Sequence, residues 1–317
     1  MAEIGVDLFK AAVILKNDDV VAIPTETVYG LAANGLSAKA ITKVFEVKNR
    51  PAFDPLIVHT SSLDRIFEFV EMVPEKAMTL FKQFSPGPLT ILLPKNNIIP
   101  DIVTSGLPLV GIRIPNHTIT LELLKDLPFP LAAPSANPFG YVSPTQASHV
   151  QDQLGNKIPY ILDGGSCVVG VESTIVGFEG NKTIIYRQGG ITKEAIESTL
   201  GESIETRISS SKPMAPGMLQ SHYAPGKKII LGDIKSLIDN NINKKIAILS
   251  FATDFQTGND YILSKTSNLA EAAQNLFAHL RAMDALDIDV IFAEYVPNLG
   301  IGRAINDRLK RAAFHEN

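Results

Sequence analysis

The sequence is poor in cysteine, with a single one in 317 residues. One cysteine excludes an internal disulfide framework and a cysteine-based zinc site, and it is typical of a protein in the reducing cytosol. No apolar run approaches the roughly 18 residues that a membrane helix needs. The first ten residues also lack the cationic and apolar regions of a signal peptide. We therefore expect a cytoplasmic protein with no membrane segment.

An excess of basic charge is also missing, because the net charge is −4. Residues 1–225 carry 18 Lys and Arg against 22 Asp and Glu, and residues 226–317 carry 11 of each. Proteins whose main task is to grip a phosphate backbone are usually basic. This balance disfavours nucleic acid as the main ligand, although it leaves room for a local patch.

The common signatures of catalytic and nucleotide sites are absent as well. The sequence contains no GxxxxGK[ST], no HExxH, no pair of CxxC motifs and no GxSxG. The absence of these motifs gives no support to a P-loop, a zinc protease or an α/β-hydrolase. One glycine cluster, at residues 163–173, is more simply a tight turn between two strands than a phosphate loop.

The first 200 residues mix strand and helix patterns. Short runs rich in valine and isoleucine, bounded by proline or glycine, predict strands, and several follow one another without a helix. Part of the sheet should therefore be antiparallel, in a mixed α+β fold. The predicted strands are 20–24, 55–59, 89–94, 109–115, 130–134, 160–165, 173–178 and 183–187, and the predicted helices are 37–47, 74–84, 118–127 and 144–155.

The composition changes after residue 207. Residues 208–228 are rich in serine, proline and glycine and have no apolar periodicity, which indicates a linker. Strand and helix patterns then alternate, which predicts a parallel α/β domain of about 90 residues. We assign 1–207 to a first domain, 208–226 to the linker and 227–317 to a second domain.

Polar side chains gather at the ends of the predicted strands, where open sheets place their ligands. They lie in residues 23–34, 133–143 and 173–174. Taken one at a time, each of these side chains could simply cap a helix or stabilise a turn. Arg113 and Arg187 lie in apolar strand contexts, where an arginine needs an anionic partner. For Arg113 that partner could be Glu26 or Glu172, in a purely structural bridge. Together these residues indicate an anion-binding cleft, and a nucleotide is the favoured ligand.

Several longer motifs then occur in order: "IPTETVYGLAAN", "KNRP", "PLIVH", "GIRIP", "APSAN", "VESTIV" and "YRQG". Together they closely resemble the threonylcarbamoyl-adenylate synthases, the YrdC-like family, over roughly residues 5–205. "PMAPGMLQSHYAP" and "GIGRAINDRLKRAA" resemble the longer form of that family, which has an added C-terminal domain. The resemblance implies a twisted mixed sheet around a concave cavity, a small Rossmann-like parallel α/β second domain, and a linker across the cavity mouth.

The resemblance also implies the reaction. The family joins L-threonine, bicarbonate and ATP into threonylcarbamoyl-adenylate and releases pyrophosphate. The product is then handed to the machinery that modifies tRNA to threonylcarbamoyladenosine. The resemblance implies Mg²⁺ with the ATP, although no carboxylate cluster marks its ligands, and any binding of tRNA should be weak.

Site residues follow from matching the motifs position by position. Lys48 and Arg50 match the cations that face the ATP phosphates, and we expect them to be catalytic because they neutralise charge at the α-phosphorus. Arg113 matches the arginine that pairs with the threonine carboxylate. The other expected threonine contacts are Thr27, His59, Ala133 and Ser173. The other expected ATP contacts are Asp54, Leu109 (through its backbone), Ser135, Asn137, Ser143, Arg187 and Tyr223.

Three points stay open at the sequence level. Asp54 stands where the family commonly has asparagine, and an anion there would repel ATP unless it meets Mg²⁺ or Lys48. His59 either assists deprotonation of the threonine amine or is a neutral wall of the pocket. The basic residues at 303, 308, 310 and 311 are more simply a solvated helix face than a docking surface.

Two other functions compete with adenylate synthesis. The first is RNA binding without catalysis, which the acidic N-terminal part disfavours. The second is carbamoyl transfer from another donor, as in hydrogenase-maturation proteins with a similar domain. Those proteins are larger and carry zinc-finger and acylphosphatase modules that this sequence lacks.

Overall fold

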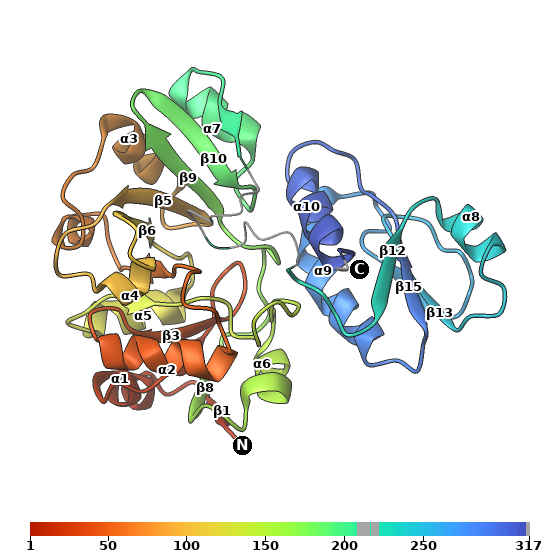
Figure 1. Cartoon of the computed structure of the whole chain (residues 1–317), viewed down its shortest axis with the longest axis horizontal. Helices are drawn as coiled ribbons and strands as arrows, with labels where there is room; N and C mark the ends of the chain where they lie inside the picture. Colours follow the sequence, from red (N-terminus) through yellow and green to blue (C-terminus); the bar gives the residue numbers. More distant parts are fainter. Residues whose placement is uncertain (208–215, 217–221, 315–317) are drawn as a thin grey trace.

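The computed structural model describes residues 1–207, 216 and 222–314. Most of the predicted linker, 208–226, therefore lies outside the described residues. The chain forms an 11-stranded sheet in its first 207 residues and a 4-stranded sheet after residue 227 (Figure 1). The predicted fold class, a mixed sheet followed by a small parallel α/β unit, is confirmed.

The large sheet contains both parallel and antiparallel neighbours, as expected from strands that follow one another without a helix. Strands β5 and β6, for example, pair antiparallel, whereas β4 and β6 pair parallel. In their order across the sheet the strands are β1 (Glu3–Gly5), β8 (Tyr160–Leu162), β2 (Val21–Ile23), β3 (Gly30–Asn34), β7 (Leu131–Ala132), β4 (Ile57–His59), β6 (Leu109–Arg113), β5 (Leu89–Pro94), β9 (Thr174–Glu179), β10 (Lys182–Arg187) and β11 (Glu205–Thr206).

The register of the central strands brings two predicted site residues together. His59 ends β4 and is paired in register with Arg113, which ends β6. Because the two strands are parallel, their carboxyl ends lie at the same edge of the sheet. The two side chains therefore reach the same cavity.

Helix α2 (Ala38–Lys48) is built as the sequence predicts. The Ser37 side chain accepts a hydrogen bond from the Ala40 amide and caps its first turn, and Ile41 and Val44 are buried. Asn49 then takes a left-handed conformation with φ of 51°, which ends the helix directly before Arg50. The other helical segments of this part are α1 (Leu8–Lys16), the 3₁₀ helix η1 (Asp64–Glu68), α3 (Glu75–Phe84), α4 (Asp101–Thr104), α5 (Thr118–Asp126), α6 (Ala147–Leu154) and α7 (Lys193–Leu200).

The second part is a parallel sheet with helices on its two faces. Helices α9 and α10 lie between this sheet and the first part of the chain, and α8 lies on the far side (Figure 1). In sheet order the strands are β12 (Lys228–Leu231), β15 (Val290–Ala293), β13 (Ile246–Ser250) and β14 (Asp260–Ile262), and the helices are α8 (Ile234–Asp239), α9 (Leu269–Asp284) and α10 (Gly302–Ala312).

The two parts share a hydrophobic core. Val28, Val142 and Val171 of the first part pack in one buried cluster with residues of α9 and α10. Gly170 lies so close to α9 that a Cβ atom there would come within 2.4 Å of the carbonyl oxygen of Ala273. The second part therefore packs directly against the first.

The basic residues of α10 are not a solvated face. Arg308 and Arg311 are buried, whereas Lys310 is exposed. Arg308 forms ion pairs with Glu172 and Asp307, and Arg311 forms one with Asp307. The predicted solvated face is therefore wrong for Arg308 and Arg311, because both guanidinium groups are neutralised by buried carboxylates.

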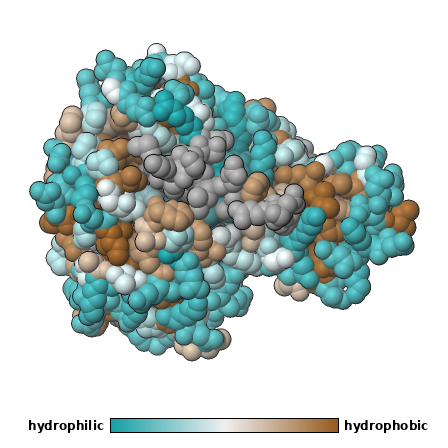
Figure 2. Space-filling view, viewed as in Figure 1, coloured by the Kyte–Doolittle hydropathy of each residue, from teal (hydrophilic) through white to brown (hydrophobic). Residues whose placement is uncertain are grey.

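Among the described residues, no helix is long and apolar enough to cross a membrane. On the face shown in Figure 2, hydrophilic residues predominate and the hydrophobic ones form patches separated by hydrophilic surface. That face therefore presents no continuous hydrophobic belt.

Candidate active site

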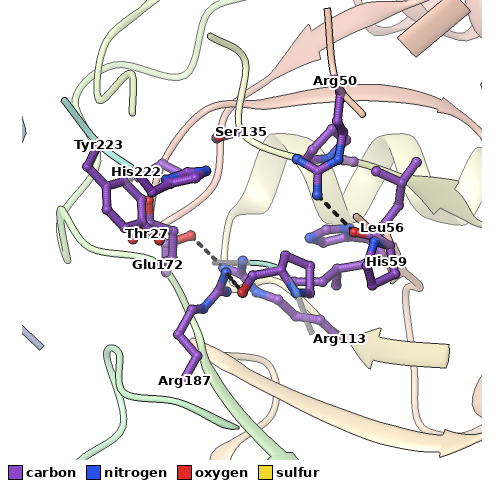
Figure 3. Close-up of a pocket in the computed structure, with 16 residues that line it drawn as sticks. Thr27, Arg50, Leu56, His59, Arg113, Ser135, Glu172, Arg187, His222 and Tyr223 are labelled. Carbon is purple, nitrogen blue, oxygen red and sulfur yellow. Dashed lines mark hydrogen bonds between the residues drawn. The ribbon is translucent and has the colours of Figure 1, made fainter. Parts of the chain in front are cut away.

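A cavity lies at the carboxyl ends of β4 and β6, where segments from across the chain converge (Figure 3). The space in it that water can occupy is about 50 Å³, enough for a few molecules. It is lined by Thr27, Val28, Arg50, Pro55, Leu56, Ile57, His59, Arg113, Ala133, Pro134, Ser135, Glu172, Arg187, Pro216, His222 and Tyr223.

Arg113 is held on one side by a carboxylate. Its Nη2 atom lies 2.8 Å from Oε1 of Glu26 and donates a hydrogen bond of 2.9 Å to Oγ1 of Thr27. Glu26 is fixed in turn because its other oxygen accepts a hydrogen bond from the Asn116 amide. Of the two structural partners considered for Arg113, Glu26 is the one present. A guanidinium oriented in this way presents its remaining donors in a fixed direction.

His59 lies beside Arg113 and is fully enclosed. Burial, and then the positive charge of Arg113, lower the pKa of His59 to about 3. The ring nitrogen Nδ1 lies 3.2 Å from the carbonyl oxygen of Ile57. The imidazole is therefore neutral near pH 7, which makes it a weak base.

Arg50 enters the cavity from the end of α2 and is paired with Asp54. Its Nη2 atom lies 2.8 Å from Oδ2 of Asp54 and donates to the carbonyl oxygen of Pro55 at 2.9 Å. Burial raises the pKa of Asp54, while the nearby cations oppose that rise. The charge of Arg50 is thus largely neutralised by its neighbour.

Lys48 lies behind the cavity wall. Its ammonium donates hydrogen bonds to the carbonyl oxygens of Ser135, at 2.6 Å, and of Asn137. Burial, and then the charge of Arg50, lower the pKa of Lys48 well below its usual value. Lys48 thus fastens the loop that bears Ser135 to the end of α2. The Asn137 side chain bonds within that loop, to the carbonyl oxygens of Pro138 and Tyr141.

Arg187 ends β10 and has no carboxylate partner in the part of the chain that the structure describes. Its Nε atom donates to the carbonyl oxygen of Ser173 and its Nη2 atom to the Ser173 hydroxyl, both at 2.9 Å. The Ser173 hydroxyl also lies 2.7 Å from Oγ1 of Thr90. Burial lowers the pKa of Arg187 to about 10, so it stays positively charged at neutral pH.

Glu172 adds the only carboxylate among the cavity-lining residues described. One of its oxygens accepts a hydrogen bond of 2.6 Å from the Ser143 hydroxyl, and the other lies 2.9 Å from Nε of Arg308. Ser143 thus acts on the cavity through Glu172. Leu109 packs with a small cluster around Ile57 and Tyr186 and does not line the cavity.

His222 and Tyr223 close the cavity on the side that faces the second part of the chain (Figure 3). Tyr223 is 1% exposed, and its ring stacks on Phe277 of α9 with centroids 5.6 Å apart. Burial, followed by the charges of Arg50 and Lys48, lowers the pKa of His222. Closed in this way, the cavity is smaller than a nucleotide requires.

The predicted site residues divide into two groups in the structure. Eight line the cavity: Thr27, Arg50, His59, Arg113, Ala133, Ser135, Arg187 and Tyr223. Six do not line it: Lys48, Asp54, Leu109, Asn137, Ser143 and Ser173. Leu109 packs against the cluster that contains Ile57, and each of the other five forms a hydrogen bond or ion pair with a residue of the cavity wall or of the loop that carries Ser135.

Glu172 and His222 line the cavity but were not predicted as site residues. Glu172 lies in the motif "VESTIV" and was considered only as a structural partner of Arg113, and His222 lies in "PMAPGMLQSHYAP"; each is adjacent to a predicted site residue, Ser173 and Tyr223. Their roles depend on contacts made by α9 and α10, which no local pattern reveals.

Two cations at the site have no carboxylate partner among the described residues. Arg113 and Arg50 each have a carboxylate, whereas the partners of Lys48 and Arg187 in the described part of the chain are carbonyl and hydroxyl oxygens. Buried cations without counter-ions are costly unless an anion meets them. The arrangement therefore fits a ligand with several negative charges. Among the described residues, no group of three or more His, Cys, Asp or Glu side chains could hold a metal ion.

Comparisons with known proteins agree with this geometry. Residues 13–189 match the Sua5/YciO/YrdC family, described as telomere recombination, and residues 191–314 match the C-terminal domain of threonylcarbamoyl-AMP synthase. The threonylcarbamoyl-AMP synthases of Pyrococcus abyssi and Bacillus subtilis are each 39% identical to the chain, over 96% of it and over 93% and 92% of their own lengths.

A solved structure extends the comparison to the fold. The crystal structure of P. abyssi Sua5 complexed with L-threonine matches with a TM-score of 0.92 and 38% identity, over 96% of this chain and 94% of that one. With both domains matched in order over nearly their whole length, the chain belongs to the threonylcarbamoyl-AMP synthase family, in the form that carries a Sua5 C-terminal domain.

Proposed function

We propose that the chain joins L-threonine, bicarbonate and ATP into threonylcarbamoyl-AMP and releases pyrophosphate. One observation carries this proposal. The cavity is lined by Arg113, which a carboxylate fixes, and by Arg187, which has no carboxylate partner among the described residues; Lys48, behind the cavity wall, has none among them either. That asymmetry fits one small carboxylate and one polyanion bound side by side.

Threonine binds on the Arg113 side. Its carboxylate pairs with Nη1 of the guanidinium, since Nη2 is held by Glu26 and Thr27 and Nε donates to the carbonyl oxygen of Gly87 at 3.4 Å. His59 and the backbone at Ala133 complete the wall. Because His59 is neutral and weakly basic, we assign it to shaping the pocket rather than to taking a proton from the amine.

ATP binds on the side of Arg50, Ser135 and Arg187, with Lys48 and Asn137 holding the loop beneath it. Its negative charge raises the fraction of Lys48 that is protonated, since a neighbouring anion favours the ammonium form. Because the described cavity is too small for a nucleotide, it must widen when ATP enters.

The chain's own residues contribute position and charge. The threonine amine and bicarbonate form a carbamate with loss of water, and a carbamate oxygen attacks the α-phosphorus as the bond to pyrophosphate breaks. Arg50, Lys48 and Arg187 stabilise the charge on the leaving group. A closed cavity also keeps water from the carbamate and from the mixed anhydride, both of which hydrolyse readily.

Mg²⁺ enters with the triphosphate. Magnesium bound to a nucleotide keeps several waters and takes only one or two protein carboxylates. The buried carboxylate of Asp54 contacts Arg50 and makes no hydrogen bond among the described residues, and an Asp54→Asn variant distinguishes a ligand of Mg²⁺ from a counter-ion of Arg50. We also infer that the protein is cytoplasmic and that the threonylcarbamoyl-AMP it makes passes to a tRNA-modifying enzyme. The first domain ends at residue 207 and the second begins at residue 227.

The test is pyrophosphate release by the purified chain with ATP and Mg²⁺, omitting threonine or bicarbonate in turn. We expect release only when both are present. An Arg113→Lys variant, which loses the planar fork, should raise the KM for threonine by roughly tenfold or more and leave the KM for ATP nearly unchanged. Intact ATP in the complete mixture, with the protein folded, would rule out the reaction and make RNA binding the next function to test.

A further inference from the structure

Arg308 connects the second part of the chain to the cavity wall. It lies in α10 and is 0% exposed. Its Nε atom lies 2.9 Å from Oε2 of Glu172, and its Nη1 atom lies 2.8 Å from Oδ2 of Asp307. The guanidinium carbon also lies 5.1 Å from the centre of the Tyr223 ring, in a cation–π contact. Arg308 thus contacts two of the residues that line the cavity, Glu172 and Tyr223.

The two carboxylates around Arg308 are not equally supported. Asp307 has a second cation, because Arg311 donates to both of its oxygens at 3.1 Å. Glu172 forms its only ion pair among the described residues with Arg308 and is otherwise held by the Ser143 hydroxyl. Loss of Arg308 would therefore leave Glu172, and not Asp307, as a buried charge without a counter-ion.

That charge would face the ATP side of the cavity. Glu172 precedes Ser173, which binds Arg187, and a Cβ atom at Gly189 would lie only 2.2 Å from the carbonyl oxygen of Glu172. The strand ends that carry Glu172 and Arg187 are therefore packed tightly together. An unpaired carboxylate in this position would repel a triphosphate, since charges in a poorly hydrated site interact strongly.

We propose that Arg308 is a positioning residue for ATP binding, supplied by the second part of the chain, which neutralises Glu172 and holds it and Tyr223 in the cavity wall. This inference rests on the proposed function only in naming ATP as the polyanion. The second part of the chain would then contribute a residue that supports ATP binding, in addition to packing against the first part in a shared hydrophobic core.

The experiment compares four full-length variants by KM for ATP and KM for threonine. Arg308→Gln leaves Glu172 unpaired, and we expect it to raise the KM for ATP by roughly tenfold or more while the KM for threonine changes by less than about threefold. Arg308→Lys keeps the positive charge but loses the planar guanidinium that contacts Glu172 and Asp307 together. Its KM for ATP should therefore lie between those of wild type and Arg308→Gln.

The double variant Arg308→Gln/Glu172→Gln tests whether the effect passes through Glu172. Removing both charges leaves two neutral amides and no buried carboxylate without a counter-ion, so most of the lost ATP affinity should return. Arg303→Gln is the matched control, because it makes the same change on the same helix at a partly exposed residue that pairs with Glu194. We expect its KM values to equal those of wild type.

Several results would overturn the proposal. The first is a KM for ATP in folded Arg308→Gln that stays within twofold of wild type or falls below it. The second is a double variant whose KM for ATP is as high as that of Arg308→Gln. The third is an equal rise in the KM values for ATP and threonine. Thermal unfolding of each variant identifies one that fails to fold, and the double variant then supplies the comparison. If wild type makes no adenylate, the proposed function fails separately, and direct titration with ATP tests Arg308 in the same variants.

Discussion

At the scale of single residues, His59 makes a measurable contribution to the pH dependence of stability. Its pKa is about 3 in the folded protein, because of burial and then the charge of Arg113, against an ordinary value near 6.5. Between these values the unfolded chain binds a proton that the folded chain does not. Neutral His59 therefore makes its full contribution to the unfolding free energy above pH 6.5, and this contribution is lost as the pH falls toward 3.

We therefore expect His59→Asn to flatten the acid limb of the stability curve. The difference in unfolding free energy between wild type and variant should change by roughly 3–5 kcal/mol between pH 6.5 and 3. Urea unfolding at several pH values measures it. His149 and His222 also have lowered pKa values, but they are present in both proteins and cancel in the comparison. Parallel curves for the two proteins would contradict this assignment.

Asp54 is the second residue with a sharp prediction, because it occupies Arg50 with an ion pair of 2.8 Å. Asp54→Asn removes the competing anion, so we expect the KM for ATP to stay the same or to fall, by up to roughly tenfold. Asp101→Asn, at an acid on the surface paired with Lys95, is the control and should change nothing. A large loss of ATP affinity that depends on Mg²⁺ would show instead that Asp54 serves the metal.

The sequence identifies single residues well where a motif carries them, and poorly where their partners are distant. Arg113 was recognisable because an arginine in an apolar strand needs an anion. Its pairing with Glu26, and that of Glu172 with Arg308, join residues 87 and 136 positions apart. Only the packed structure determines such pairs.

At the scale of elements, the end of α2 determines where Arg50 lies. Asn49 has φ of 51° and ψ of 41°, a conformation that glycine and asparagine accept and that β-branched residues avoid. We expect Asn49→Gly to have little effect. Asn49→Val should cost about 1–2 kcal/mol in unfolding free energy and raise the KM for ATP severalfold by displacing Arg50. Equal stability and equal KM in the two variants would show that this helix end does not position the arginine.

Long amphipathic helices and strands rich in valine or isoleucine were predictable, whereas elements with weak local patterns, such as β1, β3 and β11, were not. Helix α9 and strand β10 follow directly from their patterns. Strand β3, by contrast, consists of "GLAAN", which has weak strand propensity. It forms because β2 and β7 pair with it on its two sides. Such pairing overrides local preference and cannot be seen in the segment itself.

At the scale of the whole molecule, the close approach of the two parts at Gly170 is testable. Gly170 has φ of 77°, and a Cβ atom there would meet the backbone of α9 at 2.4 Å. Gly170→Ala should cost more than about 2 kcal/mol, through overpacking added to backbone strain. Gly180→Ala, at φ of 57° with open space around the added atom, should cost only about 1 kcal/mol. Similar thermal unfolding of the two variants would contradict direct packing at this point.

The order of the two parts, and the class of each, could be read from the sequence, but their contact could not. Alternating strand and helix patterns predicted the parallel sheet after residue 227. The burial of Arg308 and Arg311 contradicted the expected solvated face, because α10 packs toward the cavity with acidic partners that only the folded chain brings together.

The central claim is that one cavity brings threonine, bicarbonate and ATP together. The most direct measurement is the transfer of radiolabelled carbon from bicarbonate into an adenylate, by wild type and by Arg187→Gln. We predict that wild type forms labelled threonylcarbamoyl-AMP only with both threonine and ATP, and that Arg187→Gln needs roughly tenfold more ATP to reach the same rate. Labelled adenylate formed without threonine, or no labelled adenylate from folded wild type in the complete mixture, would contradict the account.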